Sequence, residues 1–250
     1  DDNASGVAGL LELAKLLKGN TLKYRVDLVA YSLEEPPFFA TEQMGSYVHA
    51  RSLHDAGIAV KGMVSLEMIG YYSDEEGSQD YPIGLLKWFY GNKGNYITVV
   101  QKSIQGDFAK QFKTLSFANN SILTKSFRAP SFFGGIDLSD HRNYWKFGYS
   151  AVMVTNTSFY RNTSYHLQSD TLKRLKCSVI AGAANNQLAD ESIHGKTVMD
   201  KGILYAPDFL INAGGIINCA WERKGYNRKA ALLQTAEIHA TALRIFKASA

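Results

Sequence analysis

Two adjacent carboxylates, Glu34 and Glu35, follow the apolar segment Tyr24–Leu33 of this 250-residue chain. One carboxylate can bind a metal ion while its neighbour takes a proton from metal-bound water, so the pair could support hydrolysis. A Glu-Glu pair on its own favours a solvated surface loop, because such pairs are common. The chemical interpretation therefore depends on other residues with the same placement.

Further acidic and histidine side chains recur where predicted strands or helices begin or end. They are Asp1 and Asp2 before a helix, Glu67 at the end of the segment 58–69, Asp140 and His141 in a Ser-Asp-His sequence, and Tyr165, His166 and Asp170 after the segment 151–156. Ligands of α/β proteins bind in the loops beyond the strand ends. This distribution therefore predicts a shared metal site.

The elements that must position these residues alternate between strand and helix. Helical spacing of apolar residues predicts helices over 2–18, 41–56, 104–117 and 228–247, whereas apolar runs predict strands over 24–33, 58–69, 96–101, 151–156, 179–181 and 203–205. A further helix is expected to open at Gly214-Gly215, and the irregular stretch 70–95 to be an inserted surface loop. The alternation indicates an α/β fold, a three-layer sandwich around a mostly parallel, mixed sheet.

The composition is that of an ordinary globular protein, with 46% hydrophobic and 20% charged residues. No apolar run approaches twenty residues, so no membrane span is expected. The two cysteines, Cys177 and Cys219, are too few for a disulfide framework, and their spacing fits no metal site.

Charge is distributed unevenly along the chain. Residues 1–171 contain 16 Lys and Arg against 17 Asp and Glu, whereas residues 172–250 contain 11 against 6. A basic segment can bind nucleic acid. Here the charges are dispersed without interleaved aromatic residues, so a solvated surface is favoured and no nucleic-acid partner is expected.

The order of the acidic and histidine motifs over residues 1–171 resembles the zinc-dependent aminopeptidase family, which also includes the glutaminyl cyclases. This resemblance implies a peptide substrate and two zinc ions about 3.5–4 Å apart, bridged by a carboxylate and a water. It implies that Asp1 bridges the metals, that Glu35 and His166 complete the first site, and that Glu67 binds the second.

The same resemblance implies roles for three further residues. Glu34 would be the general base, and Tyr165 would help to stabilise the oxyanion. Asp170 would orient the imidazole of His166, since metal-bound histidines usually donate their second N–H to such a partner.

Two departures from the family pattern bear on the metal count. A His-x-Asp motif, which supplies a second-zinc histidine in the family, does not precede Asp1. The second-zinc carboxylate is usually Asp, and Glu67 is one methylene longer. We therefore expect an N-terminally truncated domain with one zinc and impaired activity. We interpret His49 and His54 as surface residues and His141 as structural.

Residues 175–250 closely resemble the C-terminal nucleotide-domain segment of the leucine, glutamate, phenylalanine and valine dehydrogenases. Gly182, Asn185 and Asn212 would then line the nicotinamide side of an NAD site, or serve as ordinary strand-end and turn residues. No G-x-G-x-x-G sequence occurs in the chain to bind a pyrophosphate, so NAD binding is not expected. The domains predicted are 1–173 and 174–250.

Three functional hypotheses remain open from the sequence. The first is a zinc-dependent exopeptidase that cleaves amino-terminal peptide bonds. The second is a non-catalytic fusion of two gene fragments, and the third is a remnant NAD-binding module. The aminopeptidase resemblance implies a secreted or periplasmic protein and the dehydrogenase resemblance a cytoplasmic one, while the oligomeric state is not indicated.

Overall fold

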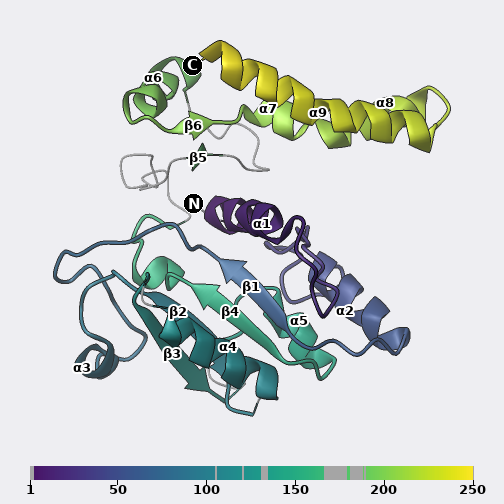
Figure 1. Ribbon diagram of the computed structural model, residues 1–250. Helices are drawn as coiled ribbons and strands as arrows, with labels where there is room; N and C mark the ends of the chain where they lie inside the picture. The colour runs from purple at the N-terminus through teal and green to yellow at the C-terminus, as the bar shows by residue number, and fades with distance from the viewer. Residues whose placement is uncertain are drawn as a thin grey trace. The chain divides into compact units, whose positions relative to one another are not determined.

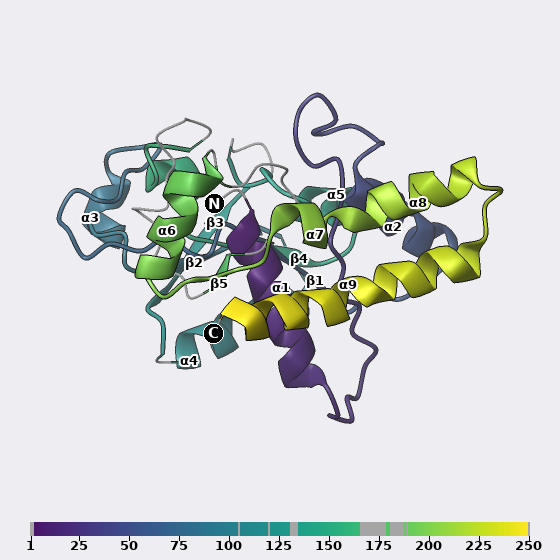
Figure 2. The same cartoon turned by 90° about the horizontal axis from the view of Figure 1, so that it is seen from above.

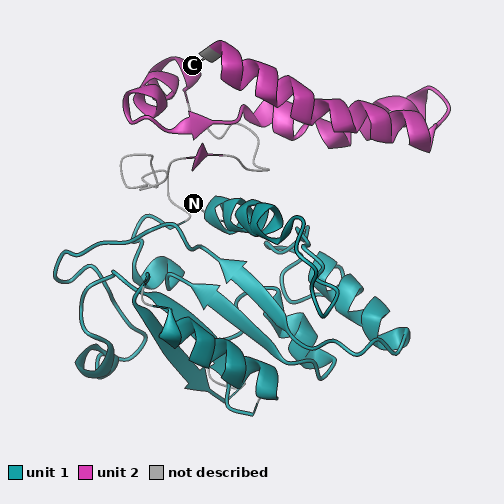
Figure 3. Ribbon diagram, viewed as in Figure 1, with its two compact units in different colours: residues 1–169 teal, residues 170–250 magenta. Residues whose placement is uncertain are grey.

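The computed structural model describes residues 3–104, 106–119, 121–130, 135–165, 179–180, 188 and 190–249. The chain divides into two compact units, residues 1–169 and 170–250, shown in different colours in Figure 3. Each unit is described by itself below. The domain boundary expected at residue 173 lies outside the described residues and stays a prediction.

A four-stranded mixed sheet forms the centre of the first unit (Figure 1). Its strands, in the spatial order β1-β4-β2-β3, are β1 (Met63–Glu67), β4 (Ala151–Thr155), β2 (Ile97–Lys102) and β3 (Thr124–Ala129). The pairs β1–β4 and β2–β3 are parallel, whereas β2 and β4 are antiparallel. The expected α/β class with a mostly parallel, mixed sheet is therefore confirmed.

Helices cover both faces of this sheet. On one face, α4 (Asp107–Ala118) contributes Ala109 to a core with Val99 and Val152, and α1 (Ala4–Leu17) packs Gly9 against Leu66. On the other face, α2 (Gly45–Asp55) and α5 (His141–Lys146) pack against Ala151 and Met153. The first unit is thus a three-layer sandwich, and its central strands are apolar because both of their faces are covered.

The start of α1 is joined to the end of β1 by side chains. Asn3 accepts a hydrogen bond from Gly6 N as the helix cap, as expected for Asn at this position. The same amide donates to Leu66 O at 2.7 Å and accepts from Met68 N at 2.8 Å. These two bonds hold the backbone on both sides of Glu67. Asn3, at the start of α1, therefore also fixes the position of the end of β1.

The strand expected over 24–33 does not form. That segment is irregular, and Tyr24 and Val26 are each 50% exposed. A strand needs a neighbour to bond its N–H and C=O groups, and no strand of the described residues pairs with this segment. The prediction of a strand over 24–33 was therefore wrong, because an apolar pattern does not show whether a neighbouring strand is available for pairing.

The remaining predicted elements of the first unit form with shifted ends. The helix expected over 41–56 begins only at Gly45, and the preceding residues from Thr41 to Met44 form turns. The strand expected over 58–69 is reduced to β1. The stretch 70–95 is mainly irregular, as predicted, but contains the short helix α3 (Leu86–Tyr90), which was not predicted, and neither was β3.

The second unit contains a small parallel β–α–β arrangement of β5 (Val179–Ile180), α6 (Glu191–Asp200) and β6 (Leu204–Tyr205). Ile180, Leu188, Val198 and Ile203 form its core. It continues through α7 (Asp208–Ile211) into α8 (Ala213–Arg223) and α9 (Arg228–Ser249), which run side by side in Figures 1 and 2. The predicted strands and both predicted helices are confirmed, while α6 and α7 were not predicted.

No helix in the described part of either unit is long and apolar enough to cross a bilayer.

The contact between α1 and β1 is close enough to test by adding one methyl group. A Cβ at Gly6 would lie 2.6 Å from Leu66 O, a backbone atom that cannot move aside. We expect Gly6→Ala to reduce the free energy of unfolding by about 1–3 kcal/mol, measured by denaturant titration. Gly84→Ala is the control, because nothing lies within 4 Å of a Cβ there. Equal stability of the two variants would contradict this packing.

Candidate active site

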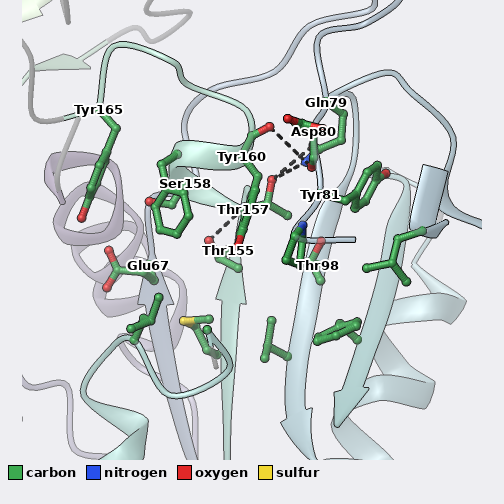
Figure 4. Close-up of a pocket in the computed structure, with 18 of the residues that line it drawn as sticks. Glu67, Gln79, Asp80, Tyr81, Thr98, Thr155, Thr157, Ser158, Tyr160 and Tyr165 are labelled. Atoms are coloured by element: carbon green, nitrogen blue, oxygen red, sulfur yellow. Dashed lines mark hydrogen bonds between the residues drawn. The ribbon is translucent and has the colours of Figure 1, made fainter. Parts of the chain in front are cut away.

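A cavity of about 330 Å³ lies in the first unit, at the carboxyl ends of β1 and β4 (Figure 4). Its floor includes Glu67, Thr155 and Thr98, which are neighbours across three strands: Glu67 pairs with Thr155, and Thr155 with Thr98. Directly paired residues project their side chains from the same face of a sheet. The register of the sheet therefore directs the Glu67 side chain to the face that the cavity occupies.

Segments far apart in the sequence bring further predicted residues to the same cavity. Glu34 and Glu35 reach it from the loop that precedes α2, and Tyr165 reaches it from the chain beyond β4. Figure 4 shows the Tyr165 side chain pointing towards Glu67. Both Glu34 and Glu67 are partly buried, whereas Glu35 is exposed. The carboxylates and the phenol expected to act together thus line one space.

Asp1, His166 and Asp170 lie outside the described residues. Among the residues that are described, no three His, Cys, Asp or Glu side chains form a group that could hold a metal ion. Carboxylate oxygens are among the ligands that zinc accepts. Glu35 and Glu67 both line this cavity, so the chemical type of their side chains is suitable for zinc.

The other walls of the cavity are mainly aromatic and aliphatic. They include Phe39, Tyr81, Pro82, Leu86, Tyr90, Tyr96, Val100, Phe127, Leu138, Met153, Phe159 and Tyr160. Tyr81 donates its hydroxyl proton to Gly91 O at 2.8 Å and lies 2.8 Å from the hydroxyl of Tyr96. Burial raises the pKa of both phenols, so these two hydroxyl groups stay neutral. The sequence patterns did not predict these residues, although the stretch 70–95, which contains Tyr81 and Tyr90, is rich in tyrosine.

A buried arginine ties the inserted stretch to the loop after β4. Arg161 is 4% exposed. Its Nε donates to Gln79 Oε1 at 2.9 Å and its Nη1 to Tyr71 O at 3.0 Å. Its guanidinium lies over the Tyr96 ring at 4.8 Å. Burial lowers its pKa, but a guanidinium remains protonated in proteins. These contacts fix the aromatic wall, and the sequence pattern did not reveal them.

The described histidines of the first unit lie outside the lining of the cavity. His141 is fully buried, donates from Nε2 to Ile136 O at 2.7 Å and packs edge-on against Trp145, in agreement with a structural role. Burial lowers the pKa of His141 to about 4. His54 is exposed, whereas His49 is partly buried and bonds to two tyrosines.

Of the residues expected on the nicotinamide side, only Asn212 lies within the described residues, between α7 and α8. Gly182 and Asn185 lie outside them.

A mixed sheet between helix layers, with polar side chains gathered beyond its strand ends, defines an α/β protein whose site has the usual position for that class. Residues 1–189 match the model of "Peptidase family M28". The chain therefore belongs to peptidase family M28.

Two relatives resemble the first part of the chain. The uncharacterized protein YfbL of Escherichia coli (strain K12) is 48% identical over 181 residues, which cover 72% of this chain and 55% of that protein. The chain thus spans about half the length of this relative. The crystal structure of the Legionella pneumophila LapA aminopeptidase is similar with a TM-score of 0.51 at 20% identity, over 70% of this chain and 41% of that one. This second likeness supports the fold.

The last part of the chain resembles other proteins. Leucine dehydrogenase of Thermoactinomyces intermedius is 51% identical over 81 residues, which are 32% of this chain and 22% of that enzyme. L-tryptophan dehydrogenase of Nostoc punctiforme is 49% identical over 81 residues, 32% of this chain and 23% of that enzyme. Both resemblances drawn from the sequence are therefore confirmed.

The burial of neutral His141 predicts a pH dependence of stability. Between pH 6.5 and about 4 the unfolded chain binds a proton at this residue that the folded chain does not, so stability falls as the pH falls. We expect a loss of up to about 3 kcal/mol across this window, measured by denaturant unfolding. His141→Gln should flatten the slope, whereas the exposed control His54→Gln should keep it. An unchanged slope in His141→Gln would disprove this assignment.

Proposed function

We propose that this chain is a zinc-dependent exopeptidase that hydrolyses amino-terminal peptide bonds. The observation that carries this proposal is the presence of Glu34, Glu35, Glu67 and Tyr165, from three distant segments, around one cavity of a family M28 chain. The structurally similar LapA of Legionella pneumophila is an aminopeptidase, which agrees with the proposal.

The proposed metal ligands are Asp1, Glu35 and His166 for one zinc ion, with Glu67 directed to a second position. A bound zinc would lower the pKa of its water towards about 7 and so supply a nucleophile near neutral pH. Asp170 would accept the second N–H of His166 and hold its ring orientation.

The proton transfers are assigned to Glu34. As a general base it would take a proton from the attacking water, and it would then deliver this proton to the departing amine. Tyr165 would donate a hydrogen bond to the oxygen that becomes negative when the carbonyl is attacked. Its position beside Glu67, on the cavity that Glu34 also lines, supports this division of roles.

The aromatic walls suggest which amino-terminal residue the cavity accepts. Tyr81, Tyr90 and Phe127 offer apolar ring surfaces, and burial keeps the two phenols neutral. A cavity of about 330 Å³ can hold a large apolar side chain such as that of leucine or phenylalanine. An acidic side chain would lose its hydration there and lie beside Glu34, Glu35 and Glu67, which line the same cavity.

The assignment of Glu34 as the base leads to a direct test. We expect Glu34→Gln to reduce kcat for leucine anilide hydrolysis by about 10²–10⁴-fold, since the amide cannot accept the proton. Zinc content, measured by atomic absorption, should stay near that of the unmodified chain. The control Glu42→Gln changes an exposed carboxylate near Arg51 and should leave both quantities unaltered. Hydrolysis that survives Glu34→Gln would rule out the proposed machinery.

The second unit is proposed to bind no NAD, because the chain contains no glycine-rich G-x-G-x-x-G loop for the pyrophosphate. A calorimetric titration with NAD⁺ should therefore give no heat of binding. Saturable binding would instead favour the remnant nucleotide-binding hypothesis.

A further inference from the structure

The segment that carries Glu34 and Glu35 is held without strand pairing. Residues 24–33 form no strand, and the chain continues irregularly through 44 until α2 begins at Gly45. A general base must nevertheless stay within hydrogen-bond reach of the proton that it takes. Contacts outside a sheet must therefore define where these carboxylates lie.

Three side chains from three parts of the chain meet just before this pair. The Tyr31 hydroxyl lies 2.8 Å from His49 Nδ1 on α2 and 2.7 Å from the Tyr144 hydroxyl on α5. The Tyr144 hydroxyl is also 3.0 Å from His49 Nδ1, which closes the triangle. We call Tyr31, His49 and Tyr144 the Tyr31 cluster.

The Tyr31 cluster is partly sheltered from solvent, because Tyr31 and His49 are partly buried and Tyr144 is buried. Tyr144 is 3% exposed and belongs to the core beneath α2 and α5, against which Tyr31 packs. Burial raises the pKa of both phenols, so both hydroxyls keep their protons. Because a buried hydroxyl without a partner is costly, the three groups constrain one another.

A second anchor closes the loop at its other end. Gly45 N donates to Ser32 O at 2.9 Å, and a Cβ at Gly45 would lie 3.0 Å from the Ser32 backbone. Within the loop, Phe38 N and Phe39 N both donate to Glu35 O. The chain from Tyr31 to Gly45 is therefore a closed loop pinned at its base, with Glu34 and Glu35 on its first part.

We propose that Tyr31, held by His49 and Tyr144, is a positioning residue that fixes Glu34 and Glu35 at the cavity. This inference rests on the proposed function, because it assigns to the Tyr31 cluster the geometry of the base and of one zinc ligand. Tyr31 itself does not line the cavity.

The variant Tyr31→Phe removes the hydroxyl and keeps the packed ring. We expect zinc affinity, measured by chelator competition, to fall about 10–100-fold, as when the partner of a metal ligand is removed. For leucine anilide, kcat should fall by about tenfold or more while KM changes less than about twofold, because Glu34 acts in the transition state. The control is Tyr149→Phe, which removes a hydroxyl bonded to Ile58 O, outside the loop.

Substitutions at His49 separate positioning from general destabilisation. His49→Gln keeps a hydrogen-bond acceptor for the Tyr31 hydroxyl and should retain zinc affinity within about threefold. His49→Leu keeps the volume, removes the acceptor and should reproduce Tyr31→Phe. Equal losses in the Gln and Leu variants, or equal losses in Tyr31→Phe and Tyr149→Phe, would overturn the proposal.

Amide hydrogen exchange tests the positioning without zinc or activity. In Tyr31→Phe, the amides of Phe38, Phe39 and Gly45 should exchange about tenfold faster than in the unmodified chain, while those of β4 should not change. An unmodified chain that binds no zinc and cleaves no anilide would refute the proposed function alone. Unchanged exchange at these three amides would refute the role of Tyr31, whatever the activity.

Discussion

The side-chain amide of Asn3 holds the end of β1 as a neighbouring strand would. It donates to Leu66 O and accepts from Met68 N, which are the backbone groups on either side of Glu67. The same oxygen caps α1 through Gly6 N. One planar amide both caps α1 and bonds to the end of β1. The position of Glu67 relative to the start of α1 is therefore fixed. The direction of Glu67 into the cavity then follows from its register with Thr155.

Polar side chains take the same role at the other walls of the cavity. Tyr31 holds the loop of Glu34 and Glu35 through His49, and Arg161 holds the aromatic stretch through Gln79. Buried polar groups are costly unless they are bonded, so each of these contacts disfavours alternative arrangements as well as stabilising this one. The Arg161 guanidinium is stabilised by backbone and amide oxygens and by the Tyr96 ring.

The sequence predicted those features that depend on neighbouring residues. The apolar spacing of α1 and α9, the apolar run of β4 and the Asn3 cap are local, and all of them form. The strand expected over 24–33 failed because pairing requires a partner that no local pattern encodes. The contact of Arg161 with Gln79 joins residues 82 positions apart, so no spacing rule could find it. Glu34, Glu67 and Tyr165 were predicted as site residues from the order of motifs in a family, since each carboxylate alone was ambiguous.

The two units differ in how far their structures depend on distant residues. In the second unit, β5, α6 and β6 form a parallel β–α–β arrangement within residues 179–205, with a core from the same stretch. Such a β–α–β arrangement can form from residues that are close in the sequence. The first unit instead gathers its carboxylates through contacts between residues such as Asn3 and Leu66, 63 positions apart. The candidate site of the first unit therefore depends on contacts between residues that are far apart in the sequence.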